Sequence, residues 1–331
     1  MHPASKVRYG IIGFGSFAER FIARAIRESP NSELLAIQKR SLALAKEKAR
    51  LFNIPLAFDS PRALVDQPDI DAVFIVSANC CHATEAIVAA RAGKHVLVEK
   101  PMATTVVEAD AMNKACKEYR VQLMVAHMVR LSPLILRMKE LIQSGSIGRV
   151  NLIKSEFIYD GTRSHRSWLL ERKVAGGGPI YDVGVHCLDT TRFLLDDEVV
   201  SVKSQLDPVP TETVTESTAH LALKFSRGTV ASIVCSYTAP IRRTSIEVVG
   251  DKGILAAESF SLSEETLILK ITFGEEDRIL ASNEEKIPIP NLYEKEVTLF
   301  SESILTHTSS PIPGEEGVKN QRVLEQAISL R

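Results

Sequence analysis

The chain has 331 residues, of which 45% are hydrophobic and 24% are charged, with 40 basic and 41 acidic side chains. This length favours two domains over one, and the composition is that of a globular protein with a sizeable core. The net charge of -1 gives no positive field for binding nucleic acid or anionic lipid. Apolar runs such as Ala72–Val76 have the length of a strand and cannot span a bilayer.

The cysteine content and the first residues of the chain bear on the cellular compartment of the protein. The five cysteines are an odd number without a C-x-x-C pair, which favours neither a disulfide framework nor a zinc site. Residues Met1–Lys6 contain no apolar core of a signal peptide. We therefore expect a protein of the reducing cytoplasm.

The first 125 residues alternate between strand and helix patterns. Apolar runs predict strands at Val7–Ile12, Leu34–Ile37, Leu56–Phe58, Ala72–Val76, His95–Val98 and Gln122–Ala126. Helical patterns lie between them at Phe17–Glu28, Ser41–Phe52, His82–Ala92 and Thr104–Tyr119, with a further helix start at Ser60-Pro61. This order predicts an α/β fold with a Rossmann-type, doubly wound parallel sheet over residues 1–125.

The pattern changes after Ser132-Pro133, which opens a helix to about Gln143. Strands joined by turns follow at Asn151–Ile158, Val200–Leu206, Ser217–Phe225, Thr229–Tyr237, Ser245–Val249, Gly253–Ala257 and Thr266–Phe273. Helices at Glu294–His307 and Gly317–Leu330 close the chain. Residues 126–331 are therefore predicted to form an α+β domain with a large, mostly antiparallel open sheet.

A glycine loop, Gly13-x-Gly15-x-x-Ala18, follows the first strand and opens a helix. Gly13 permits a tight turn, Gly15 lets the backbone approach a pyrophosphate, and Ala18 allows close packing of helix on strand. The phosphates would then sit at the helix N-terminus. Turn chemistry alone is the alternative, but the strand–loop–helix setting favours a dinucleotide site.

The end of the second strand bears on the choice of dinucleotide. It reads Gln38-Lys39-Arg40-Ser41, without the carboxylate that would bind a ribose 2′-hydroxyl. Arg40 offers a planar fork, Lys39 a point charge and Ser41 a hydroxyl to a 2′-phosphate. The alternative is that both cations belong to a solvated loop. We expect NADP(H) to be preferred, with NAD(H) as the second choice.

Lys100 follows the fifth predicted strand in Glu99-Lys100-Pro101, at the edge where doubly wound sheets bind ligands. A partly desolvated ammonium beside a cationic nicotinamide should lose proton affinity and exchange a proton near neutral pH. The alternative is a surface lysine paired with Glu99.

A glycine-rich segment, Gly176–Gly178, precedes a helix in which Asp182, His186 and Asp189 are spaced i, i+4 and i+7. These side chains share one helix face, where Asp182 can orient the imidazole or contact a hydroxyl. His186 could instead be a core histidine. A zinc site is disfavoured because no second histidine or cysteine has ligand spacing, and we predict no metal.

Together these segments resemble the glucose–fructose oxidoreductase, inositol dehydrogenase and rhizopine-catabolism (Gfo/Idh/MocA) family. The specific signatures are Glu99-Lys100-Pro101 and Asp182-x-Gly184-x-His186. Further matching segments are the glycine loop, Ser77–His82, His127–Pro133, Asn291–Tyr293 and Pro313–Gly317. The sequence departs from the family at Ala78, where most members have proline, and at Lys39, where many have an acid.

The resemblance implies a Rossmann domain joined to an α/β domain whose open sheet often forms a dimer or tetramer contact. It implies hydride transfer between nicotinamide and a secondary alcohol or carbonyl of a sugar, cyclitol or polyol. Lys100 would be the catalytic lysine, His186 the proton-transfer group and Asp182 the residue that orients the substrate.

The predicted contacts extend beyond these three residues. Predicted cofactor contacts are Gly13, Phe14, Gly15, Ser16, Phe17, Lys39, Arg40, Ser41, Ser77, Ala78, Asn79, His82, Glu99, Lys100, Pro101, Arg130 and Tyr293. Predicted substrate contacts are Lys100, Arg163, His165, Trp168, Tyr181, Asp182 and His186. Two rival functions stay open: a dehydrogenase or reductase of a non-sugar small molecule, and a nucleotide-sensing protein without catalysis.

Overall fold

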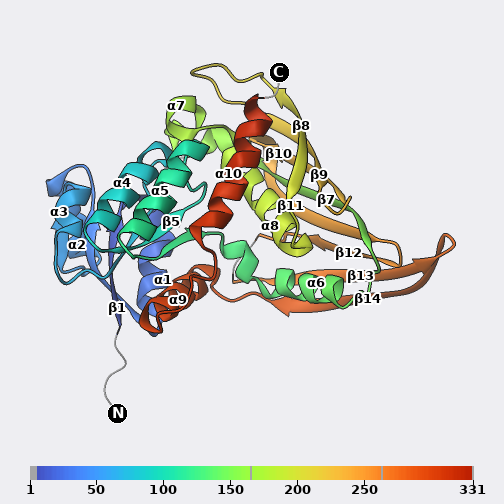
Figure 1. The fold of residues 1–331 in the computed structure, drawn as a ribbon, viewed down its shortest axis with the longest axis horizontal. Helices are drawn as coiled ribbons and strands as arrows, with labels where there is room; N and C mark the ends of the chain where they lie inside the picture. Colours follow the sequence, from blue (N-terminus) through green and yellow to red (C-terminus); the bar gives the residue numbers. More distant parts are fainter. Residues whose placement is uncertain (1–5, 165, 262–263, 330–331) are drawn as a thin grey trace, which may run out of the picture. The chain divides into compact units, whose positions relative to one another are not determined.

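The computed structural model describes residues 6–164, 166–261 and 264–329 (Figure 1). The chain forms two compact units, each described here by itself. Unit 1 contains the residues up to Ala126 together with Tyr293–Gln321, and unit 2 contains His127–Leu292 and the residues from Arg322 onward. Every helix within the described ranges is too short or too polar to cross a membrane.

Unit 1 contains a parallel sheet of six strands in the order β3-β2-β1-β4-β5-β6. The strands are β1 (Val7–Ile12), β2 (Ser32–Gln38), β3 (Leu56–Phe58), β4 (Ala72–Ile75), β5 (His95–Glu99) and β6 (Leu123–Ala126). All four residues of β4 are buried, as expected of a strand covered on both faces. The predicted doubly wound parallel sheet is confirmed.

The helices of unit 1 begin where the sequence provides caps. They are the π-helix η1 (Ala18–Ile22), α1 (Ala23–Glu28), α2 (Leu42–Leu51), α3 (Pro61–Val65), α4 (Asn79–Arg91), α5 (Val106–Glu118), α9 (Leu292–Leu305) and the first half of α10 (Gly314–Ser329). Ser41 caps α2, Ser60 caps α3, and Thr105 forms a capping box with Glu108 at α5. Helix α4 begins three residues before the predicted start at His82.

The return of α9 to unit 1 differs from the two-part division expected from the sequence, which ended the first domain at residue 125. The first crossing does fall at Ala126, but α9 and the start of α10 belong with the parallel sheet. Polar contacts hold α9 there: Ser301 Oγ lies 2.9 Å from the Tyr9 hydroxyl, and the Asn31 side chain donates to the Thr298 carbonyl at 3.0 Å. These contacts join residues almost 300 positions apart, which local patterns do not reveal.

Unit 2 is built on an eight-stranded sheet in the order β14-β13-β12-β11-β7-β10-β9-β8. The strands are β7 (Val150–Asp160), β8 (Val199–Asp207), β9 (Thr218–Phe225), β10 (Val230–Ser236), β11 (Thr238–Gly250), β12 (Gly253–Glu258), β13 (Thr266–Glu275) and β14 (Arg278–Pro288). Only the β7–β10 pair among these is parallel, so the prediction of a mostly antiparallel sheet is confirmed.

Strand β14 was not expected from the sequence. It forms a long hairpin with β13 through Glu276 and Asp277, both of which have positive φ. That geometry suits a two-residue hairpin turn, but Glu-Asp lacks the Asn-Gly or Asp-Gly signal that normally reveals one. The strand is also exposed along most of its length, so it has no apolar alternation to detect.

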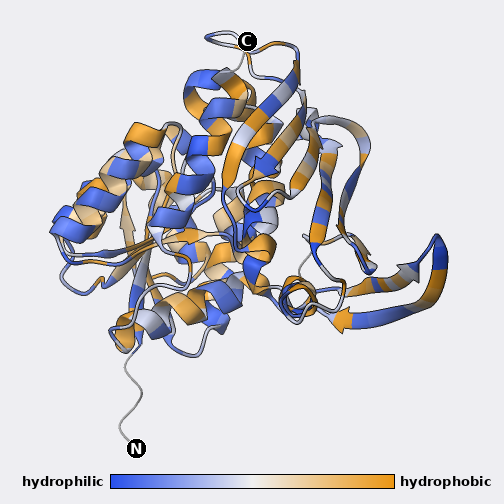
Figure 2. Ribbon diagram, turned by 45° about the vertical axis from the view of Figure 1, so that its right-hand side comes forward, coloured by the Kyte–Doolittle hydropathy of each residue, from blue (hydrophilic) through white to orange (hydrophobic). Residues whose placement is uncertain are grey.

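The strands of the eight-stranded sheet have one buried and one outward face. On β9 the apolar side chains from Ala219 to Phe225 are buried at alternate positions, while His220, Ala222 and Lys224 are exposed. Figure 2 shows the resulting alternation of hydrophobic and hydrophilic residues along these strands. Helix α8 (Val185–Leu195) packs on β7 and β10, and α6 (Pro133–Gln143) packs on α8.

Candidate functional site

The predicted cofactor segments of unit 1 follow the carboxyl ends of neighbouring parallel strands. Gly13 follows β1, Lys39 follows β2, Ser77 follows β4 and Lys100 follows β5. Because these strands are parallel neighbours, all four residues lie at the same edge of the sheet. The order reverses between β1 and β4, and such a switch point is where open α/β sheets bind ligands.

The glycine loop crosses this switch point in close contact with the next strand. Gly13 has φ +85°, and a Cβ atom there would lie 2.6 Å from Ser77 Cα. The Gly15 N–H donates to the Gly13 carbonyl at 2.7 Å, and the helix begins at Ser16. The loop thus has no room for a side chain at residue 13, and the first N–H groups of a helix follow it. This arrangement fits the pyrophosphate of a dinucleotide.

Gln38, which sequence reasoning missed, fixes the glycine loop to the end of β2. Its buried side chain accepts a hydrogen bond from the Gly13 N–H at 3.1 Å and donates to the Asp59 carbonyl at 3.0 Å. The Gln38 carbonyl also accepts from the Phe14 N–H at 2.9 Å. The one available signal was a polar residue at the end of an otherwise apolar strand.

The three residues predicted to hold a 2′-phosphate have different surroundings. The Lys39 ammonium donates to the Phe14 carbonyl at 2.5 Å and lies 4.0 Å from Glu19 Oε1. The Ser41 hydroxyl accepts from the Leu44 N–H as the cap of α2. The Arg40 side chain is exposed. Arg40 is therefore the most accessible of the three to a solvent-borne anion.

The segment after β4 is held by the half-buried side chain of Glu85. The Ser77 hydroxyl donates to Glu85 Oε2 at 2.5 Å, and burial raises the pKa of Glu85 to about 7. Ala78 is extended and precedes α4, whose first residue is the buried Asn79. Glu85 was not anticipated, because it lies inside a helix with no motif around it.

Hydrogen bonds of Glu99 and Pro101 hold the backbone on either side of Lys100. Its backbone N–H donates to Glu99 Oε2 at 3.1 Å, and the Glu99 side chain is mostly buried. The His82 ring lies between the Pro101 carbonyl, 3.0 Å from Nδ1, and the Ser77 carbonyl, 3.2 Å from Nε2. Burial lowers the pKa of His82 to about 4, so this ring is neutral at physiological pH. His82 thus connects the segments after β4 and β5.

Tyr293 at the start of α9 packs beside the helix that follows the glycine loop. Its ring centroid lies 5.7 Å from that of Phe17 and 5.2 Å from that of Phe21. The structure thus brings Tyr293 together with the predicted contact Phe17, although about 275 residues separate them in the chain. Aromatic contacts of this kind fix the orientation of both rings.

In unit 2, the Asp182 and His186 signature spans a change of helix type. Asp182 lies in the π-helix η5 (Ile180–Gly184), and His186 is the second residue of α8. The expectation of one uniform α-helix is thus corrected, because a π turn widens the helix where these side chains project. Such π turns are frequent at functional sites.

The Asp182 carboxylate is buried and receives two donors. Tyr159 on β7 donates to Oδ2 at 2.6 Å, and the Arg166 guanidinium lies 3.2 Å from Oδ1. Burial and the Asp182 charge raise the pKa of Tyr159, so the phenol remains a donor. The Tyr237 ring lies edge-on to Tyr159 at 5.3 Å between centroids. Tyr159 and Arg166 were missed, because nothing local marks them as partners of Asp182.

His186 lies against an aromatic ring of the sheet. The Phe157 ring is stacked on the imidazole with centroids 6.0 Å apart and an interplanar angle of 26°. The Arg242 guanidinium lies 4.9 Å from the centroid of the same Phe157 ring. His186 as a whole is 8% exposed and is therefore buried.

Arg130, a predicted cofactor contact, forms a buried ion pair with Asp189. Its Nε and Nη2 atoms donate to the two carboxylate oxygens at 2.8 and 2.7 Å. His127 Nε2 lies 3.7 Å from the same carboxylate. The two donors on one carboxylate join the segment before α6 to α8 within unit 2.

The predicted substrate contacts near the histidine segment differ in accessibility. Arg163 is exposed and pairs with Asp160 at 2.9 Å, and Trp168 is half-buried with the Arg166 guanidinium 5.9 Å from its ring. Tyr181 is fully buried and packs against Gly177, so it serves the core of unit 2 instead of an accessible surface. His165 lies outside the described residues.

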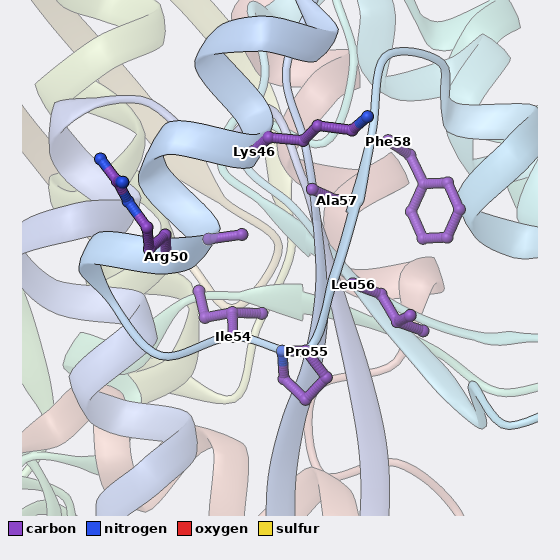
Figure 3. Close-up of a pocket in the computed structure, with 8 residues that line it drawn as sticks. Lys46, Arg50, Ile54, Pro55, Leu56, Ala57 and Phe58 are labelled. Atoms are coloured by element: carbon purple, nitrogen blue, oxygen red, sulfur yellow. The ribbon is translucent and has the colours of Figure 1, made fainter.

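A separate pocket of about 380 Å³ lies beside β3. Figure 3 shows Lys46 and Arg50 projecting from α2 above the segment from Ile54 to Phe58. None of its lining residues is a predicted site residue. We assign it no role in the candidate site.

Comparison with known proteins gives consistent matches over both units. Residues 7–127 match the model of an oxidoreductase family with an NAD-binding Rossmann fold, and residues 135–256 match the Gfo/Idh/MocA C-terminal domain. The chain is 31% identical to 1,5-anhydro-D-fructose reductase of Ensifer adhaerens, over 94% of this chain and 92% of that protein.

Two solved structures are also similar. Aldose–aldose oxidoreductase from Caulobacter crescentus, complexed with glycerol, has a TM-score of 0.87 and 28% identity, covering 97% of this chain and 96% of that one. Levoglucosan dehydrogenase complexed with NADH and L-sorbose has a TM-score of 0.85 and 25% identity, covering 98% and 96%.

The fold, the glycine cradle and these matches define an oxidoreductase with a nicotinamide dinucleotide-binding Rossmann domain. The chain belongs to the Gfo/Idh/MocA family. The resemblance stated from its motifs is thereby confirmed.

The buried Arg130–Asp189 pair generates a stability prediction. Asp189→Asn removes the charge but keeps the shape, leaving the Arg130 guanidinium buried without its counter-charge. We expect the free energy of unfolding to fall by about 3–5 kcal/mol. Urea unfolding measures it, with Asp66→Asn as control. Asp66 pairs with Arg62 on the surface, and that substitution should cost under about 1 kcal/mol. Equal small losses in both variants would contradict the importance of the buried pair.

Proposed function

We propose that this protein interconverts a secondary alcohol and a carbonyl on a sugar, cyclitol or related polyol, with NADP(H) as the preferred cofactor. The observation that carries the proposal is Lys100 at the same sheet edge as the glycine cradle, backed by Glu99 and His82. The similar proteins support the substrate class, since their names refer to an anhydro-sugar, to aldoses, and to levoglucosan with sorbose.

Each catalytic group has one task in this proposal. The nicotinamide, when bound, supplies or accepts the hydride. His186 takes the proton of the substrate hydroxyl in oxidation and returns it in reduction. Lys100 Nζ hydrogen-bonds to the reacting oxygen and stabilises its developing charge. Asp182, held by Tyr159 and Arg166, orients a neighbouring substrate hydroxyl.

Further residues are proposed to contact the dinucleotide and the substrate. The main chain of Gly13–Phe17 and the side chains of Ser77, Asn79 and Tyr293 would line the dinucleotide, and Arg163 and Trp168 would face the substrate. A cytoplasmic location is proposed with them, consistent with five cysteines that are all free thiols.

The NADP(H) preference rests on charge at the end of β2. Arg40 is exposed there, and Lys39 neutralises part of the negative charge of Glu19. A 2′-phosphate would meet two cations and no carboxylate in this segment. A similar structure contains NADH, so NAD(H) stays the alternative cofactor.

The two rival functions require different sets of residues. A nucleotide sensor needs the cradle but has no use for a buried Asp182 held by two donors in unit 2. A dehydrogenase of non-sugar alcohols would keep both groups, and only the substrate distinguishes it. A screen of sugars and polyols for NADP+ reduction, followed by non-sugar alcohols, separates these cases.

Cofactor choice is tested at Arg40. Arg40→Ala should weaken NADP(H) binding by about 1.5–3 kcal/mol, the range for a charged hydrogen bond, and leave NAD(H) binding nearly unchanged. Calorimetric titration of each cofactor measures both. Arg50→Ala, on α2, is the matched control and should affect neither. Equal losses for both cofactors would mean that Arg40 does not contact the 2′-phosphate.

The catalytic roles are tested by Lys100→Met and His186→Ala. Each should lower kcat by about 10²–10⁴-fold, the usual contribution of a positioned proton-transfer group. NADP(H) affinity in His186→Ala should stay within a few-fold, because His186 belongs to unit 2. Lys114→Met, at an exposed position of α5, should behave as the unmodified protein. Near-normal turnover in both catalytic variants would contradict the roles proposed for Lys100 and His186.

We also propose a homodimer or homotetramer that associates through the outward face of the eight-stranded sheet. Val230 and Ile268 on that face are both 44% exposed, which is unfavourable in a monomer. Light scattering should give two or four times the chain mass, and Ile268→Glu should shift it toward the monomer. A monomeric unmodified protein at micromolar concentration would overturn this proposal.

A further inference from the structure

Glu216, just ahead of β9, has a buried side chain that none of the roles assigned above uses. It is 0% exposed, and its Oε1 atom accepts a hydrogen bond from the Ile180 backbone N–H at 3.1 Å. The two residues are 36 positions apart in the chain, and both belong to unit 2. Ile180 begins the helical run, η5 followed by α8, that carries Asp182 and His186.

The start of this helical run takes an acceptor from a distant segment. Pro179, the residue before Ile180, has no N–H to donate. The two N–H groups that follow Ile180 both donate to the Gly178 carbonyl, at 3.0 and 3.2 Å. Among the described residues, Glu216 supplies the acceptor for the N–H of Ile180 itself. The carboxyl thus caps the helix start, a task that a proline side chain at the N-cap cannot perform.

The glycine turn before the helix is fitted to the same residue. A Cβ atom on Gly178 would lie 2.0 Å from the Glu216 carbonyl oxygen and 3.1 Å from its Oε1. The backbone at residue 178 therefore lies directly against both the backbone and the carboxyl of Glu216, an approach that requires glycine. A side chain there would push the helix start away from its cap.

A second series of contacts joins the Glu216 segment to Asp182 through the sheet. The carbonyl of the next residue, Ser217, accepts from the Tyr237 N–H at 2.8 Å. The Tyr237 ring lies edge-on to Tyr159 at 5.3 Å between centroids, and Tyr159 donates to Asp182 Oδ2 at 2.6 Å. The segment that supplies the cap thus also supports the phenol that holds the Asp182 carboxylate.

We propose that Glu216 is a positioning residue, whose carboxyl oxygen caps the helix that carries Asp182 and His186 and so fixes the direction of both side chains. The proposal rests on the roles proposed above for these two residues. Asp182 lies two residues and His186 six residues beyond the capped N–H, so a shift of the helix start displaces both. A displacement of about 1 Å at a reacting group is enough to lower turnover strongly.

The cap requires an acceptor at the right distance and does not require a charge. Burial raises the pKa of Glu216, which favours the neutral carboxyl, and the neutral form still offers a carbonyl oxygen to the Ile180 N–H. The other oxygen, Oε2, has no hydrogen-bond partner among the described residues. A buried oxygen without a partner costs stability, so the contribution of this carboxyl lies in its Oε1 atom.

A set of variants separates the distance of the acceptor from its charge. Glu216→Gln keeps an acceptor at the same distance without the charge, whereas Glu216→Asp keeps the charge but withdraws it by one methylene. Gly178→Ala leaves the carboxyl intact and pushes the helix start away from it. Glu212→Gln and Glu212→Asp, at an exposed position of the same loop, are the matched controls.

Hydrogen exchange of the unliganded protein reports the cap without any substrate. Exchange in peptides that contain Ile180 should quicken about tenfold in Glu216→Asp and Gly178→Ala, because the helix start opens more often. Glu216→Gln and both Glu212 variants should exchange as the unmodified protein does. Unchanged exchange in Glu216→Asp would overturn the proposal. Equal acceleration in Glu216→Gln would overturn it as well, because the charge would then matter and not the distance.

Steady-state kinetics distinguish positioning from a purely structural role. Well below the melting temperature of each variant, Glu216→Asp and Gly178→Ala should lower kcat by about 10–100-fold and raise the KM for substrate. The Kd for NADP(H) should stay within about twofold, because the glycine loop belongs to unit 1. Glu216→Gln should keep kcat within about threefold of the unmodified protein.

Two further outcomes are informative. A lowered melting temperature with unchanged kcat and KM in Glu216→Asp would make Glu216 a structural residue only, and would contradict the proposal. Absence of turnover in the unmodified protein would count against the proposed function, and the exchange of Ile180 in Glu216→Asp and Glu216→Gln would then decide on the cap.

Discussion

The close approach of Gly13 to Ser77 is the constraint on which the candidate cofactor site depends. A side chain at residue 13 would collide with the backbone of Ser77, just after β4, so the loop can be tight only with glycine there. That contact joins the ends of β1 and β4 at the point where strand order reverses. Gln38 and His82 then connect the neighbouring strand ends to the same place, and each uses backbone groups as partners. The cradle is thus rigid before any ligand arrives, which reduces the entropy lost on binding.

The sequence predicted what depends on local pattern and missed what depends on distant partners. Apolar runs located the strands of the parallel sheet, and Ser41, Ser60 and Thr105 marked helix starts because caps are short-range interactions. The β13–β14 hairpin was missed because its turn and its exposed strand lack the usual signals. The membership of α9 in unit 1 was missed because it is decided by contacts between the two ends of the chain.

The same distinction applies to the candidate site. Gly13, Lys100, Asp182 and His186 stand in recognisable motifs, so the sequence alone could identify them as candidate site residues. The residues that contact Gly13 and Asp182, namely Gln38, Tyr159 and Arg166, come from other elements and have no motif of their own. Their roles follow from burial, since a buried polar group must find a partner or change its protonation. Tyr181 shows the converse, because proximity to a motif suggested a contact that its complete burial does not support.

The carboxyls held inside this protein are of two kinds. In unit 2, the carboxyl groups of Asp182 and Asp189 each lie against an arginine and a further donor or imidazole. Such compensation fixes geometry at little cost, provided that both partners remain. Burial instead raises the pKa of Glu85 and Glu296 in unit 1 and of Glu216 in unit 2. A group that keeps a proton by burial responds to pH, whereas a compensated pair does not. Carboxyls of this second kind therefore occur in both units, and Glu85 is the one that is hydrogen-bonded to Ser77, against which the glycine loop packs.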